Sequence, residues 1–128
     1  LGAVASTEAH MQPEALLEAY DAALGAWPDD TIAHFGRANA LHALGRLDAA
    51  RAAYQELIAA HPGHVAALNN LAEVYADLGC SRRAQATISR AFSLVDNDHP
   101  LYPVLLDTRQ RVATTAGGLS PRKCTGPP

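Results

Sequence analysis

The side chains best suited to chemistry in this 128-residue chain are its six histidines, and their spacing argues against a metal site. The closest pair, His61 and His64 in the stretch HPGH, has no cysteine or carboxylate close by to complete a set of metal ligands. His34 and His42 lie eight residues apart, which places them on one side of a helix as surface or groove residues. The stretch DNDH, residues 96 to 99, lacks the glycine and the distal glutamate of a calcium-binding loop, and helix capping explains it better.

Nucleophilic and cofactor chemistry find no support in the sequence either. Ser81 and Ser89 have no neighbouring base, and no glycine-rich phosphate loop occurs. The two cysteines, Cys80 and Cys124, form neither a metal motif nor a disulfide framework. We expect a tolerated small residue at Cys80 in a turn and an exposed thiol at Cys124 in a tail rich in proline and glycine. We therefore expect no enzyme and no cofactor, and either a cytoplasmic or a periplasmic location fits.

Composition argues against two classes of partner. The formal net charge of -3 gives no basic surface for nucleic acid, and no apolar run reaches the roughly 18 residues of a membrane span. Hydrophobic residues make up 48% of the chain but aromatic residues only 5%, which favours closely packed, alanine-rich helices. The first residues, LGAVASTEAH, contain neither an initiator methionine nor a basic leader region, so we expect a piece of a longer protein.

The sequence repeats itself with a period of 34 residues, over two full units and one half unit. The clearest matches pair Gly45 with Gly79, Ala50 with Ala84, and Tyr54 with Tyr20. Apolar positions at helical spacing predict first helices over 31–44 and 65–78, each ended by a glycine in the left-handed conformation. Second helices are predicted at about 47–60 and 81–94. The short turns make each pair antiparallel, and the recurring alanines let the two helices approach closely.

The two ends of the chain are expected to complete a short array. Residues 12–28 are expected to be the second helix of a truncated repeat, preceded at 1–11 by the remnant of an upstream helix or linker. A capping helix is predicted over residues 99–116, with its helical part starting at about residue 100 and Asp98 as its N-cap. Residues 117–128 are predicted to be a flexible tail. Its apolar stripe consists of Leu101, Leu105, Thr108 and Val112.

Over residues 12 to 98 the sequence resembles the tetratricopeptide repeat family, with repeats at 31–64 and 65–98. The signature residues are Gly45, Ala50, Tyr54 and Pro62 in the first unit, and Leu68, Leu71, Tyr75, Gly79, Ala84 and Ala91 in the second. Departures are His34, Arg37 and Ala38 in the first unit and Asp96 in the second. The resemblance implies an all-α, right-handed helical solenoid of antiparallel helix pairs with a C-terminal capping helix.

The resemblance also implies a function, which is binding of a peptide in a concave groove lined by the first helices. The groove candidates are Phe35, Asn39, His42, Ala66, Asn69, Asn70, Glu73 and Asp77. Some members of the family clamp a C-terminal carboxylate with cations, but Phe35, Pro100 and Val104 stand at those positions here, so that mode is not expected. With Glu73 and Asp77 in the groove, we expect a non-catalytic protein-interaction module that binds a neutral or basic segment.

Two alternatives stay open. The chain is also similar to the helical tails of bacterial C39-type cysteine peptidase-like proteins. That similarity implies a structural role against an upstream catalytic domain that carries the catalytic cysteine and histidine. The other alternative is a homodimer formed through the open N-terminal face, where Leu16 and Tyr20 would otherwise expose apolar surface.

Overall fold

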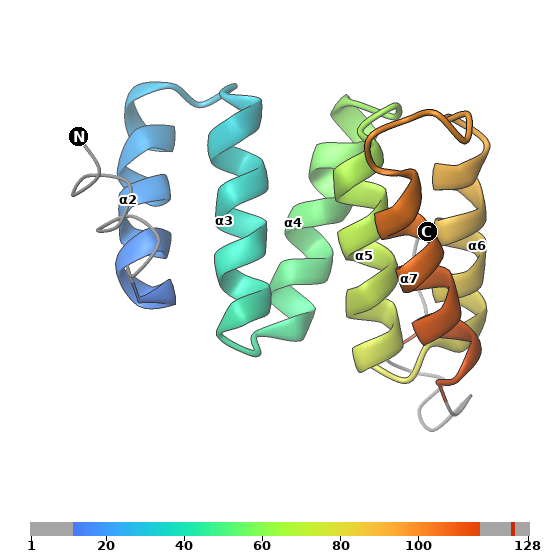
Figure 1. The fold of residues 1–128 in the computed structure, drawn as a ribbon. Helices are drawn as coiled ribbons and strands as arrows, with labels where there is room; N and C mark the ends of the chain where they lie inside the picture. Colours follow the sequence, from blue (N-terminus) through green and yellow to red (C-terminus); the bar gives the residue numbers. More distant parts are fainter. Residues whose placement is uncertain (1–11, 116–123, 125–128) are drawn as a thin grey trace.

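The computed structural model describes residues 12–115 and residue 124. These residues form an all-α helical solenoid in which each helix packs against the next (Figure 1). The helices are α2 (Pro13–Ala26), α3 (Thr31–Ala43), α4 (Leu47–Ala60), α5 (Val65–Asp77), α6 (Ser81–Phe92) and α7 (Tyr102–Ala113). α5 lies at the centre of the C-terminal half because it packs against α4, α6 and α7.

Glycine ends the first helix of each repeat, as the sequence predicts. Gly45 and Gly79 have φ angles of 74° and 80°, the left-handed region that residues with a Cβ rarely adopt. The Arg46 N–H donates to the Leu41 carbonyl at 3.0 Å, and the Cys80 N–H donates to the Tyr75 carbonyl at 2.8 Å. These bonds satisfy carbonyls that the helix leaves without a partner, and they turn the chain back toward an antiparallel second helix.

The core lies between the helices and contains the recurring residues of the repeat. Ala50 and Ala84 are both 0% exposed. Their small side chains let the second helix of each repeat pack closely against its neighbours. The large buried side chains include Tyr54, Leu68, Leu71 and Tyr75, while Leu78, at the end of the same apolar side of α5, is only half-buried. α2 differs from the other helices because none of its residues is buried. Its Tyr20 ring occupies the space beside Gly36, where a Cβ would lie 2.2 Å from Tyr20 Cζ.

The C-terminal helix is shorter than predicted and is capped differently. α7 begins at Tyr102, and its N-cap is Leu101, so the prediction that Asp98 caps it is wrong. The His99 ring takes part instead, because His99 Nδ1 accepts the Leu101 N–H at 3.0 Å. Three of the four residues of the predicted stripe, Leu105, Thr108 and Val112, are buried, and Leu101 is half-buried.

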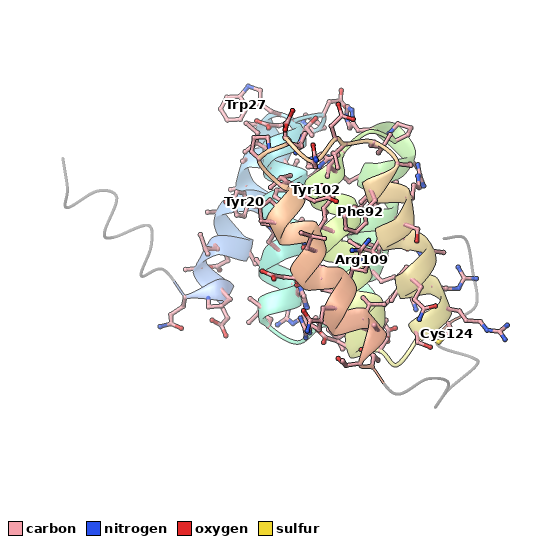
Figure 2. All side chains as sticks on the ribbon, turned by 45° about the vertical axis from the view of Figure 1, so that its right-hand side comes forward. Tyr20, Trp27, Phe92, Tyr102, Arg109 and Cys124 are labelled. Carbon is pink, nitrogen blue, oxygen red and sulfur yellow. A yellow bond between two sulfur atoms is a disulfide. The ribbon has the colours of Figure 1, made fainter. Side chains whose placement is uncertain are left out.

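The prediction of two unpaired cysteines is also wrong. Cys80 and Cys124 form a disulfide with an S–S distance of 2.08 Å, and Cys80 is buried. The reason is that Cys124 lies against the turn between α5 and α6, with its Cα 5.4 Å from that of Cys80 (Figure 2 labels Cys124). The expectations for residues 1–11 and for the rest of the 117–128 tail lie outside the described residues.

Candidate interaction surface on the first-helix face

Side chains from the first helices α3, α5 and α7 meet on one face of the solenoid, here called the first-helix face. At its centre, the Asn39 Oδ1 atom accepts two hydrogen bonds. One comes from the Tyr54 hydroxyl, and the other from Asn70 Nδ2 at 2.9 Å. Both bonds require the same orientation of the Asn39 amide. Its Nδ2 donor is left without a partner among the described residues.

A pocket of about 280 Å³ opens beside these two asparagines, between α3 and α5. Its lining residues are Asn39, His42, Ala43, Asn70 and Glu73. Four of the eight residues proposed from the sequence therefore lie around one cavity. The pocket is widely open to solvent, and its lining is about equally polar and apolar, with amide donors and acceptors beside the exposed Ala43.

The carboxylates of this face are paired. Arg111 Nη2 lies 2.6 Å from Asp77 Oδ1, and Arg111 Nη1 lies 3.6 Å from Glu73 Oε2. His42 Nε2 lies 2.8 Å from Asp77 Oδ2, and the Thr108 hydroxyl donates to Glu73 Oε1 at 3.2 Å. Arg111 and Thr108 therefore belong to the face although sequence reasoning left them out. The 34-residue period could have found Arg111, because Arg111 stands one period after Asp77 and so occupies the equivalent position on α7.

Three of the residues predicted from the sequence, Phe35, Ala66 and Asn69, do not line the pocket. Asn69 is 4% exposed, so its predicted exposure in the groove is wrong. It lies on the densely packed α5, where its Nδ2 donates to Asn70 Oδ1 at 3.1 Å and its Oδ1 finds no hydrogen-bond partner among the described residues. The half-buried Phe35 ring packs on His64, with ring centroids 5.0 Å apart, and near Tyr54. Ala66 is half-buried and brings no polar group.

The two histidines of the HPGH stretch have local partners. His64 is the N-cap of α5, because its Nδ1 accepts the Ala67 N–H at 3.1 Å, and His61 lies 3.2 Å from the Thr31 hydroxyl. Burial is the main cause that lowers the pKa of His64 from 6.5, and the charge of His61 lowers it further. Burial likewise raises the pKa of the Tyr54 hydroxyl to about 12.

The described residues contain no group of three His, Cys, Asp or Glu side chains arranged to hold a metal ion. Nor does any helix in this part of the chain have the length and apolar character to cross a membrane. Antiparallel helix pairs with an open pocket between successive first helices define a helical-repeat domain with a surface suited to protein contacts.

The comparison with known proteins identifies the repeat. Two family models, each described as tetratricopeptide repeat, match residues 17–64 and 41–102. Residues 17–102 therefore form a tetratricopeptide repeat domain. Such repeats generally mediate protein–protein interaction and are generally not catalytic. No curated protein matches the chain, and the family matches give no support to the resemblance to C39-type peptidase tails.

Proposed function

We propose that this protein is a non-catalytic interaction module that binds an extended segment of a partner protein on the first-helix face. The observation that carries the proposal is the open pocket between α3 and α5, lined by Asn39, His42, Ala43, Asn70 and Glu73. Ligand sites combine apolar lining with a few fixed polar groups that orient the ligand, and this open pocket offers both. Its position between two successive first helices suits a chain that crosses the helices.

Asn39 supplies a donor for such a chain. Its Oδ1 is already occupied by Tyr54 and Asn70, so its Nδ2 is oriented before a ligand arrives. A peptide carbonyl beside Nδ2 would accept a hydrogen bond without the cost of ordering the asparagine side chain. We therefore assign to Asn39 the role of binding the backbone of the partner segment. Asn70 holds Asn39 in place, because its Nδ2 donates to Asn39 and its Oδ1 already accepts from Asn69 Nδ2 at 3.1 Å.

The ion pairs of the face favour an uncharged segment. The expectation of a neutral or basic partner rested on Glu73 and Asp77 as free carboxylates. Arg111 pairs with both, and His42 and Thr108 occupy further carboxylate oxygens. A lysine or arginine of a ligand would have to compete with these partners. We propose a neutral segment, with the pocket holding an uncharged side chain.

A pair of matched substitutions tests the proposal. Ala43→Arg fills the pocket rim from an exposed position at the end of α3, where a cation is favourable to the helix. Ala52→Arg introduces the same side chain at an exposed position of α4, outside the pocket. Peptides are selected from a random library on the wild-type protein, and the affinity of the selected sequence is measured by calorimetry.

We expect wild type and Ala52→Arg to bind the selected peptide equally, and Ala43→Arg to bind it at least about tenfold more weakly. Circular dichroism checks that all three proteins are equally helical. Equal affinity of all three proteins would place the peptide elsewhere and contradict the proposal. A selection that yields no peptide above background would contradict it as well.

A further inference from the structure

α2 carries an apolar stripe that its counterparts in the repeat bury. Leu16, Tyr20, Ala23 and Trp27 are spaced by four, three and four residues, which places them on one side of the helix. The 34-residue period aligns the first three with Ala50, Tyr54 and Leu57, whose exposures are 0%, 0% and 4%. In α2 all three are only half-buried, and Trp27 is 65% exposed.

The packing of the helices explains the difference. α4 is held between α3 and α5, whereas α2 packs chiefly against α3. Among the described helices, α2 is the outermost at its end of the array (Figure 1). Tyr20, at the edge of the stripe, reaches Gly36 of α3. The rest of this side of α2, with Leu16, Ala23 and Trp27, has the sequence of a helix–helix contact but has no described helix against it. Figure 2 shows Trp27 directed away from the helices.

The turn after α2 extends this apolar surface and makes it acidic. The Asp30 N–H donates to the Trp27 carbonyl at 3.1 Å, which closes the turn, and Ile32 beyond it is 78% exposed. Asp29 and Asp30 lie between these two apolar residues and are exposed. All ten lysine and arginine residues of the chain lie at or after Arg37, and Arg37 itself pairs with Asp21 at 2.7 Å. We call Leu16, Tyr20, Ala23, Trp27, Asp29, Asp30 and Ile32 the N-terminal end surface.

We propose that the N-terminal end surface binds an amphipathic helix of a partner protein that carries apolar residues on one side and lysine or arginine beside them. Apolar side chains would cover the stripe, and the cations would lie near Asp29 and Asp30. Charge favours this occupant over a second copy of the chain. A two-fold contact between two α2 helices would bring carboxylates together without a lysine or arginine on either helix.

Trp27 is the single tryptophan of the chain, so its fluorescence reports on this surface alone. The probes are two acetylated, amidated helical peptides with the same leucine face, one with lysine and one with glutamate at every polar position. We expect the leucine–lysine peptide to shift Trp27 emission to shorter wavelength in a saturable titration. The leucine–glutamate peptide should bind about tenfold more weakly or not at all.

Four variants test separately whether binding of the leucine–lysine peptide depends on the acidic residues, on the apolar residues or on the pocket. Asp29→Asn with Asp30→Asn removes both charges, and asparagine can still cap α3, where Asp30 Oδ1 now accepts the Ile32 and Ala33 N–H groups. We expect this variant to bind the leucine–lysine peptide about tenfold more weakly. Ile32→Ser should also weaken binding, whereas Leu94→Ser, at another exposed apolar residue, should not. Ala43→Arg in the pocket should leave the Trp27 response unchanged.

Three results would overturn the proposal. The first is equal affinity for the two peptides, which would show that charge plays no part. The second is the absence of a Trp27 response to the leucine–lysine peptide. The third is self-association in sedimentation experiments at the concentrations used, which the peptide does not reverse and which Ile32→Ser abolishes. That last result would assign the surface to a second copy of the chain.

Discussion

Asn39 connects three helices through one oxygen atom, because Tyr54 on α4 and Asn70 on α5 both donate to its Oδ1. The Tyr54 side chain is 0% exposed, so its hydroxyl has no access to water in place of Asn39. We expect Asn39→Ala to lower the free energy of unfolding by roughly 1–3 kcal/mol, the cost of burying an unsatisfied polar group. Urea unfolding followed by circular dichroism measures it.

The control for this prediction removes the hydroxyl as well. Tyr54→Phe in the Asn39→Ala background leaves no buried donor at this position, so the double variant should be more stable than Asn39→Ala alone. If the double variant is instead less stable by the sum of the two single effects, the loss of stability in Asn39→Ala does not come from an unsatisfied Tyr54 hydroxyl. The stability argument for the asparagine pair would then be wrong.

His64 makes stability depend on pH, because the same nitrogen that would take a proton caps α5. Its pKa is lowered from 6.5, so the folded protein binds fewer protons there than the unfolded chain. The contribution of His64 is fully present above pH 6.5 and is lost as the pH falls through the lowered pKa. We expect wild type to lose more stability than His64→Asn between about pH 7.5 and about pH 5.5.

Asparagine caps a helix without titrating in this range, which makes His64→Asn the suitable comparison. His61→Asn serves as the control, since it removes only the smaller effect of the neighbouring charge and should keep most of the pH dependence. Urea unfolding at the two pH values gives the difference for each protein. Identical pH dependence in wild type and His64→Asn would show that the cap does not titrate as argued.

At the scale of elements, α7 determines the charge of the first-helix face. Arg111 pairs with Glu73 and Asp77, whereas Arg109 on the same helix lies over the Phe92 ring at 4.5 Å. We expect Arg111→Ala to free the two carboxylates and to raise affinity for a lysine-containing version of the selected peptide relative to the parent peptide. Because the pair is half-exposed, the cost in stability should be at most about 1 kcal/mol.

Arg109→Ala is the matched control, because it removes a charge from α7 without touching Glu73 or Asp77. Calorimetry with the two peptides on three proteins gives the ratio of affinities. An unchanged ratio in Arg111→Ala would mean that the carboxylates of α5 do not reach the bound segment. The neutral preference of the site would then need another cause.

The elements were more predictable than the contacts between them. Local rules set the left-handed Gly45 and Gly79 and the buried Ala50 and Ala84, and these recur every 34 residues, so the helices could be placed from the sequence. Register on α5 put Asn69 in the groove, but packing on several sides of that helix buries it. Arg111 and Asp77 stand one 34-residue period apart, so the repeat places them side by side on successive first helices, but the period does not say which of these positions form ion pairs.

At the scale of the whole molecule, the Cys80–Cys124 disulfide joins the centre of the array to its C-terminal end. The 44-residue separation encloses both α6 and α7. Neither cysteine lies in a motif, and Cys124 follows the last helix, so only the folded chain brings them together.

The disulfide should stabilise the domain mainly by restricting the unfolded chain, because a long loop between α5 and the C-terminus is closed in advance. We expect Cys124→Ser to lower the free energy of unfolding by about 2–4 kcal/mol. Urea unfolding with and without dithiothreitol provides the internal control: reduction should bring wild type to the stability of Cys124→Ser and leave that variant unchanged. If dithiothreitol does not alter wild type although alkylation shows that both thiols are free, the cross-link does not hold the C-terminal half together. The stability of α6 and α7 would then come from core contacts such as Leu105 and Val112 alone.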